Sequence, residues 1–279
     1  MTYQRILIPL GHEARSAEQL NGALAFARAV DAHVVAVAAS NLECSVAPRV
    51  LLSKARQPKL ACALLLERAA NAARRFEIAC HLENIASFES IVVEAASIDA
   101  ILQHMRGCDL VVLQQADPRA ENVAARRLAL NKAIRAATRP VLVMPHAPGV
   151  PSIGSRILVA WDGNHDATRA VADALPLLRR ADRVEVITWS PPSARGLERA
   201  QDEADAVCAT LAGHQVKAYP VVQVADAPLA DALLAHAALR EADMIVMGMG
   251  GCAPVSDGVL GSTSQRVLAQ ATVPVFMSH

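Results

Sequence analysis

The feature of this sequence that most restricts its fold is an internal repeat at about half of the chain length. Residues 5–9 (Arg-Ile-Leu-Ile-Pro) reappear at residues 156–160 (Arg-Ile-Leu-Val-Ala), an offset of 151. Residues 106–113 and 240–247 share Arg-x-x-Asp followed by four apolar residues, and here the offset is 134. The whole chain, at 279 residues, is nearly twice the usual domain length of roughly 150. The sequence therefore predicts two homologous domains.

The fall in the offset indicates that the first copy holds about 16 or 17 extra residues. We place this insertion at residues 41–59, a stretch that contains two prolines. Between the copies, residues 146–154 are rich in Pro and Gly, which is typical of a linker. The predicted domains are residues 1–147 and residues 155–279.

Within each copy, short apolar runs alternate with helical patterns. In the second copy we predict strands at 157–161, 184–189, 216–222, 244–247 and 273–277, and helices at 166–179, 197–212, 229–238 and 262–270. Strands that are apolar on both faces, each followed by a helix, indicate a parallel sheet covered on both sides. The predicted fold class is α/β, with two homologous doubly wound, Rossmann-like domains that each hold a five-stranded parallel sheet. Ligands of such sheets bind beyond the carboxyl ends of the strands, where the winding reverses.

Composition argues against several classes of function. Lys plus Arg (27) equals Asp plus Glu (27) and aromatic residues are 3%, so nothing attracts the chain to nucleic acid. No apolar run approaches the roughly 20 residues that span a bilayer, and the first residues lack the apolar core of a signal peptide. We therefore expect a cytoplasmic protein without a membrane partner. The six cysteines never form C-x-x-C, so we expect small buried hydrophobic side chains rather than a metal or disulfide framework.

A glycine-rich loop follows the predicted fourth strand of the second copy. It has the spacing Gly248-x-x-Gly251, nine residues, then Gly261-Ser262 at the start of a helix. Glycines let a backbone approach a phosphate closely, and the N–H groups of a helix N-terminus attract anions. A Walker A loop requires Lys where Gly261 stands, and the dinucleotide motif belongs after a first strand, so we reject both. The alternative is a simple turn followed by a capped helix, in which Gly248 bends the chain.

The spacing of this loop resembles the nucleotide-binding signature of universal stress proteins. Asp162, which directly follows the first predicted strand of the second copy, is similar to an aspartate of that family. A Thr-x-Pro-Val pattern precedes the last strand in both halves, as it does in the family. The resemblance covers essentially the whole chain, as a tandem arrangement of two such domains.

The resemblance implies one bound adenine nucleotide (ATP, ADP or AMP, with Mg²⁺ possible beside ATP) in the second domain. The residues implied to hold it are, in chain order, Asp162, Thr188, Trp189, Met247, Gly248, Gly251, Gly261, Ser262, Thr263 and Ser264. The first is assigned to the adenosine, the backbone of the next two to the base, the following pair to the ribose, and the last five to the phosphates. The alternative for Asp162 is a turn or helix-capping residue.

The sequence departs from the family pattern at two places. No basic residue follows Gly251, so AMP or ADP is favoured over a triphosphate, and Arg266 either compensates in part or is an ordinary solvated arginine. In the first copy the loop has no glycines, because the positions matching the motif and Asp162 hold Gln114, Asp117, Arg127, Leu128 and Gly11. We expect that this first domain does not bind nucleotide.

By resemblance the function is stress response or signalling. The halves are expected to pack as a pseudo-dimer, or two chains as a homodimer, through the last strands at 140–144 and 274–277. The downstream protein partner is not identified by the sequence. Nine histidines without metal-ligand spacing and the absence of a nucleophile motif predict no catalytic residue and no metal site. The alternatives are a protein-binding scaffold that takes no nucleotide, and a slow nucleotide hydrolase.

Overall fold

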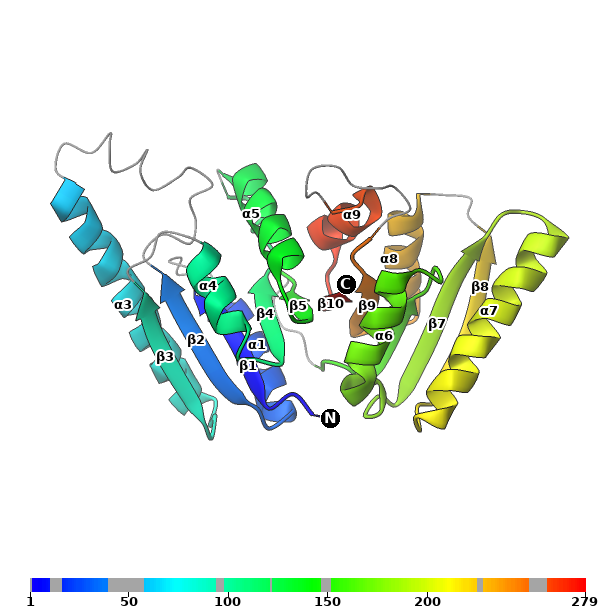
Figure 1. The fold of residues 1–279 in the computed structure, drawn as a ribbon, viewed down its shortest axis with the longest axis horizontal. Coiled ribbons are helices and arrows are strands. Elements are labelled where there is room, and N and C mark those ends of the chain that lie inside the picture. The colour runs from blue at the N-terminus through cyan, green and yellow to red at the C-terminus, as the bar shows by residue number, and fades with distance from the viewer. Residues whose placement is uncertain are drawn as a thin grey trace. The chain divides into compact units, whose positions relative to one another are not determined.

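The computed structural model describes residues 2–10, 17–39, 58–93, 98–120, 122–146, 152–224, 228–250 and 260–279. The chain divides into two compact units, residues 2–149 and residues 150–279. Each unit is an α/β domain in which strands and helices alternate along the chain (Figure 1).

The N-terminal unit holds a five-stranded parallel sheet in the order β3-β2-β1-β4-β5. Its strands are β1 (Arg5–Leu10), β2 (His33–Ala39), β3 (Phe88–Val93), β4 (Leu110–Gln114) and β5 (Val141–Met144). Its helices are α1 (Ala17–Ala29), α3 (Pro58–Leu82), α4 (Ile98–Met105) and α5 (Val123–Ala136). The chain leaves β2 at Ala39 and enters α3 at Pro58, so the longer connection of this half lies where the repeat offsets predict the insertion.

The C-terminal unit holds a matching parallel sheet in the order β8-β7-β6-β9-β10. Its strands are β6 (Arg156–Ala160), β7 (Arg183–Ser190), β8 (Ala218–Val224), β9 (Met244–Gly248) and β10 (Val275–Ser278). Its helices are α6 (His165–Leu178), α7 (Ala194–Gly213), α8 (Leu229–Leu239) and α9 (Ser262–Gln270). Helix α6 packs on β9 and β10, α7 packs on β7 and β8, and α8 packs against α9.

The predicted fold class is confirmed, and it follows from where the apolar residues lie. The central strands β4, β6 and β9 are almost wholly buried runs of Leu, Ile, Val and Met. Such strands bury both faces only when helices cover the sheet on both sides. The predicted elements of the second copy are all present. Most of their boundaries differ, by three residues at most: the helix predicted from residue 197 begins at Ala194, and the last strand begins at Val275 in place of residue 273. The strand predicted from residue 216 begins at Ala218, after Gln215 with its positive φ of 66°.

The aspartate of the repeated Arg-x-x-Asp pattern has a structural role in both halves. The carboxylate of Asp109 accepts hydrogen bonds from the backbone N–H groups of Gln4 and Arg5, just before and at the start of β1. Asp243 accepts in the same way from residues at the start of β6, including Arg156. Each aspartate thus ties the end of one helical crossover to the beginning of the first strand.

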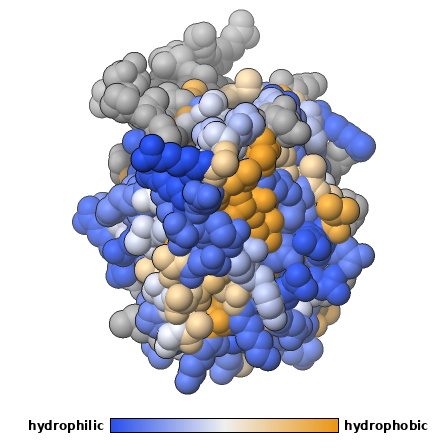
Figure 2. All heavy atoms as spheres, turned by 90° about the vertical axis from the view of Figure 1, so that its right-hand side faces the viewer, coloured by the Kyte–Doolittle hydropathy of each residue, from blue (hydrophilic) through white to orange (hydrophobic). Residues whose placement is uncertain are grey.

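β8 is an edge strand of the C-terminal sheet. Figure 2 looks onto this side of the molecule, where apolar side chains form a strip within a mostly hydrophilic face. Tyr219 and Val224 of β8 are 49% and 39% exposed. Pro220, in the same strand, has no N–H to leave unpaired, which is a common protection of an exposed sheet edge. In the part of the chain that the structure describes, no helix is long and apolar enough to cross a membrane.

Candidate functional site

The carboxyl end of β6 leads into a tight turn that positions Asp162. The N–H of Trp161 donates to the carbonyl of Ile187 at 2.9 Å, which extends the pairing of β6 with β7 by one residue. Gly163 then takes a positive φ of 73°, a conformation that favours glycine. Asn164 caps α6, because its side-chain oxygen accepts from the N–H of Ala167 at 2.7 Å.

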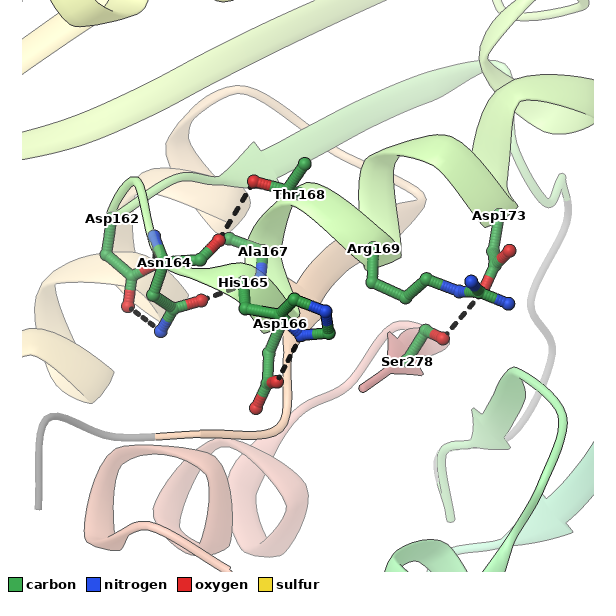
Figure 3. Close-up of polar contacts among 9 residues, drawn as sticks. All are labelled: Asp162, Asn164, His165, Asp166, Ala167, Thr168, Arg169, Asp173 and Ser278. Atoms are coloured by element: carbon green, nitrogen blue, oxygen red, sulfur yellow. Dashed lines mark hydrogen bonds and ion pairs between the residues drawn. The ribbon is translucent and has the colours of Figure 1, made fainter. Parts of the chain in front are cut away.

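The carboxylate of Asp162 faces this turn (Figure 3). It accepts from the backbone N–H and the side-chain amide of Asn164 at 3.2 and 2.7 Å. Partial removal from water raises the pKa of Asp162, although hydrogen bonds from backbone N–H groups oppose the shift. The alternative interpretation of Asp162 as a turn residue therefore has a direct structural basis. Two hydrogen bonds leave further lone pairs of the carboxylate available to a ligand hydroxyl or amine.

The exit of β9 passes very close to the first turn of α6. A Cβ atom at Gly248 would stand 2.7 Å from the backbone nitrogen of Ala167 and 2.8 Å from the Cβ of Asp166. A Cβ at Gly250 would stand 2.5 Å from a carboxylate oxygen of Asp166. Gly248 is therefore required by the packing of the loop against the backbone of α6, whereas at Gly250 the close atom is the end of a side chain that can move. The close approach at Gly248 places the loop beside the turn that holds Asp162.

The N-terminus of α9 carries no side-chain cap. Gly261 is the N-cap residue, and the first helical bond runs from the N–H of Gln265 to its carbonyl. No hydrogen-bond acceptor is recorded among the described residues for the N–H groups of Ser262, Thr263 and Ser264. Three adjacent donors at the positive end of a helix dipole are an arrangement that attracts anions.

The hydroxyls at this helix end differ in their surroundings. Ser264 is buried, and its hydroxyl donates to the carbonyl of Met249 at 3.4 Å, so it joins α9 to the exit of β9. Ser262 is exposed and Thr263 half-buried. Of the three hydroxyls, those of Ser262 and Thr263 are thus the ones open to a ligand, while Ser264 contributes its N–H group.

Arg266 does not point its charge at this helix end. Its guanidinium forms a two-pronged ion pair with Asp231 of α8, with distances of 2.7 and 2.6 Å. The hypothesis that Arg266 compensates for the missing basic residue therefore finds no support in its geometry. The carboxyl group of Asp166 lies against Gly250. Beside the described part of the loop there is therefore an acidic side chain, while the guanidinium of Arg266 is already paired with Asp231.

Thr188 and Trp189 lie near the carboxyl end of β7, beside the turn after β6. Ala160 is in register with Ile187, so Trp189 lies one strand over from the Asp162 turn. Thr188 is buried, whereas Trp189 is half-buried with its indole N–H hidden from water. That N–H has no hydrogen-bond partner among the residues that the structure describes. Met247 is buried in β9 and pairs with Met277 of β10, so its side chain is part of the core.

A buried polar cluster, which we did not predict from the sequence, lies on the Trp189 side of the sheet. Glu185 of β7 and His236 of α8 are 4% and 5% exposed, and their side chains are 3.0 Å apart. The other ring nitrogen of His236 lies 2.9 Å from the amide of Gln223. Arg183 and Arg240 also contact Glu185, at 2.9 and 3.4 Å. The detectable signal was a charged residue within an apolar strand pattern, at position 185.

The matching segment of the N-terminal unit is built differently. Helix α5 begins at Val123, so Arg127 and Leu128 lie inside it, whereas their counterparts Gly261 and Ser262 stand at the start of α9. Asp117 is buried, accepts from the N–H of Arg119 at 2.8 Å and lies 3.3 Å from His146. A carboxylate occupies the loop, and the helix begins five aligned positions earlier than α9 does, at Val123 instead of at Leu128, the match of Ser262.

The structure thus brings together several predicted residues at the carboxyl edge of one sheet: Asp162 and Gly248 about the first turn of α6, and Ser262, Thr263 and Ser264 at α9. Gly251 and Cys252 lie outside the described residues, as does Gly11. Among the residues that the structure describes, no group of three or more His, Cys, Asp or Glu side chains is arranged to hold a metal ion.

Comparison with known proteins gives a consistent family assignment. A model described as the universal stress protein family matches residues 155–279. A curated relative from Thermus aquaticus, named "universal stress protein in QAH/OAS sulfhydrylase 3′ region", is 33% identical over 136 residues. That alignment covers 43% of this chain and 96% of the relative.

Solved structures match the entire chain. A universal stress protein from Archaeoglobus fulgidus superposes with a TM-score of 0.74 at 18% identity, covering 99% of this chain and 96% of its own. One from Pseudomonas aeruginosa, described as putative, gives a TM-score of 0.61 at 17% identity, covering 98% and 92%. At these identities the structures establish the fold, and they do so for both halves. The chain therefore belongs to the universal stress protein family, with a second domain of the same fold preceding the one that the family model matches.

Proposed function

We propose that the C-terminal domain binds one adenine nucleotide, with its phosphate on the N-terminus of α9 and its adenosine beside Asp162. The observation that carries this proposal is the uncapped start of α9. Ser262, Thr263 and Ser264 present three N–H groups there without a recorded acceptor, at the edge of the sheet where Asp162 also lies. Three charge-assisted hydrogen bonds of about 1.5–3 kcal/mol each are compatible with affinity on the order of micromolar.

The charges around the loop favour AMP or ADP over ATP. Asp166 places a carboxylate against Gly250, and Arg266 is engaged by Asp231. Each added phosphate brings negative charge toward a loop against which a side-chain carboxyl group, that of Asp166, already lies. We therefore expect the affinity to fall from AMP and ADP to ATP, and Mg²⁺ to recover part of the loss.

The N-terminal domain is proposed to take no nucleotide. Its α5 begins before the position that matches Gly261, and the buried carboxylate of Asp117 occupies the loop. An anion would meet a like charge and helix side chains in place of open N–H groups. The stoichiometry expected from this asymmetry is one nucleotide per chain, and the role that follows is nucleotide-linked stress signalling.

The test is calorimetric titration of the full chain with AMP, ADP and ATP, with and without Mg²⁺. Gly261→Val is expected to abolish binding by placing a branched side chain at the helix start. The backbone there (φ −56°, ψ 151°) suits any residue, so the fold should persist. The matched control is Arg127→Val, at the equivalent position of the N-terminal half, which should leave binding unchanged.

Other outcomes separate the alternatives. Absence of binding by the folded wild-type protein would contradict the proposal and favour a protein-binding scaffold. Turnover of ATP that depends on Mg²⁺ and is lost in Asp162→Ala would favour a hydrolase. Binding of two nucleotides per chain, or full retention of affinity in Gly261→Val, would show that the proposed site is wrong.

A further inference from the structure

In the buried cluster of Glu185, His236 and Gln223, the charge of Glu185 determines which group donates each hydrogen bond. Burial alone would raise the pKa of Glu185, but hydrogen bonds from His236 and Arg183, and the charges of Arg240 and Arg183, lower it below its ordinary value. Glu185 is therefore ionised at neutral pH and can only accept hydrogen bonds. The nitrogen of His236 that faces it, Nε2, must carry a hydrogen.

The contact with His236 also determines how the side-chain amide of Gln223 is oriented. The amide nitrogen of Gln223, Nε2, lies 2.9 Å from the other ring nitrogen of His236, Nδ1. An amide nitrogen can only donate, so Nδ1 accepts this hydrogen bond. Gln223 must therefore donate its amide N–H to His236. Its carbonyl oxygen Oε1 has no partner among the described contacts and is left as an acceptor directed away from His236.

Gln223 lies next to the unpaired indole of Trp189. The two residues are direct register partners on neighbouring parallel strands, so their side chains project to the same face of the sheet. Within the described parts of the chain, Trp189 offers a buried donor without an acceptor, and Gln223 offers an acceptor without a donor. An unpaired buried donor costs stability, so such a group is usually retained because something else satisfies it.

The N-terminal half provides an internal comparison. The repeat aligns Glu185 with Val35, Trp189 with Ala39 and His236 with Leu102. Val35 and Ala39 are buried apolar residues of β2. The same fold thus forms without the polar cluster, and the cluster occurs in the half that also has the open start of α9.

We propose that Trp189 and Gln223 form a donor–acceptor pair that recognises the Watson–Crick edge of the adenine base. Adenine presents an acceptor at N1 beside a donor amino group at C6, which complements the indole N–H and the amide oxygen respectively. Hypoxanthine presents the reverse polarity, a donor at N1 beside an acceptor oxygen. Glu185 is the positioning residue, acting through His236 to keep the oxygen of Gln223 toward the base. This inference rests on the proposed function and specifies its base.

Because the indole N–H is buried, the base reaches it only with a local movement of Trp189. The chain has two tryptophans, so in a Trp161→Phe background the fluorescence of Trp189 is observed alone. A change in that emission on addition of AMP, saturating with the calorimetric affinity, is expected. Identical emission with and without saturating AMP would contradict contact with the base.

The decisive experiment measures AMP and IMP affinities for single variants of the full chain. Trp189→Phe keeps an aromatic ring, though a smaller one, and removes the N–H. It should weaken the binding of AMP about tenfold while changing the affinity for IMP less than about twofold. Gln223→Met should likewise reduce the ratio of the affinity for AMP to the affinity for IMP. The control is Gln201→Met on the exposed face of α7, where the glutamine side chain donates to Asp205 of the same helix.

Glu185→Gln tests the positioning role separately. With a neutral partner, His236 is free to exchange tautomers and Gln223 to turn its amide, so the AMP-to-IMP ratio should fall without loss of fold. Nitrogen chemical shifts of His236 should report a single tautomer in the wild type and a mixture in the variant. Wild type that binds AMP and IMP equally, or variants that keep the ratio, would overturn this inference but not nucleotide binding. Wild type that binds neither would overturn both.

Discussion

Gly248 and Ala167 approach so closely that a single Cβ atom added to the glycine would lie 2.7 Å from the backbone nitrogen of the alanine. The neighbouring atoms are the backbone carbon and the Cβ of Asp166, which belong to the first turn of α6 and cannot move independently of it. A residue predicted from a nucleotide-binding motif is thus also a packing residue. Because Gly248 has no side chain, the chain after β9 can pack directly against the first turn of α6, beside the turn that holds Asp162.

Gly248→Ala is therefore expected to destabilise the C-terminal unit by about 1–3 kcal/mol, as overpacking usually does. Both tryptophans, Trp161 and Trp189, lie in this unit, so urea unfolding followed by their fluorescence reports its stability. Gly213→Ala is the matched control, because a Cβ there meets nothing within 4 Å at the end of α7. It should be neutral or slightly stabilising. Equal midpoints for the two variants would refute this account of Gly248.

The stability of the C-terminal unit should fall on acidification through the titration of Glu185. Its pKa is lower in the folded state than its ordinary 4.5, so its stabilisation is present above pH 4.5 and is lost as the pH falls through the folded value. Glu185→Gln removes this titration. A plot of the fluorescence unfolding midpoint against pH should be flatter below pH 4.5 in the variant. Parallel curves would mean that Glu185 does not contribute.

The repeated aspartates should differ in importance between the halves. Asp243 accepts from the N–H groups of Gly154, Ser155 and Arg156 and from the hydroxyl of Ser152, whereas Asp109 accepts from two N–H groups. Asp243→Ala should cost about 2–3 kcal/mol and Asp109→Ala about 1–2 kcal/mol. Hydrogen exchange measured by mass spectrometry would show faster exchange in β6 and β1 respectively. If Asp243→Ala made exchange faster in β1 but not in β6, or Asp109→Ala the reverse, the structural role given to these aspartates would be contradicted.

Of the three described cysteines, the two buried ones, Cys80 and Cys108, should resist alkylation. Burial, and to a smaller extent the negative charge of Glu77, raises the pKa of Cys80 to about 12. Burial also raises the pKa of Cys108. At pH 8 only about one Cys80 thiol in ten thousand would be the reactive thiolate. Peptide mapping after iodoacetamide should find these two positions unmodified in the native chain and modified in urea. Rapid native labelling of Cys80 would show that it is accessible.

The sequence by itself determined the fold class and the duplication of the domain. Those follow from period and polarity: apolar runs such as residues 157–161, repeated with helices between them, leave a covered parallel sheet as the arrangement that buries them. It also determined the difference between the halves, since the residues that match Gly261 and Ser262 in the first copy are Arg127 and Leu128. These are local properties, which a single chain segment carries without reference to its neighbours.

Only the tertiary structure decided which side chains meet. That Gly248 faces Ala167, that Arg266 is held by Asp231, and that Glu185, His236 and Gln223 form one buried chain depend on elements between 13 and 81 residues apart. Burial changes the meaning of such residues, because a charge or an indole N–H removed from water must find a partner. Sequence spacing records which residue types are present, but the packing of helices on the sheet decides which of them are paired and which remain for a ligand.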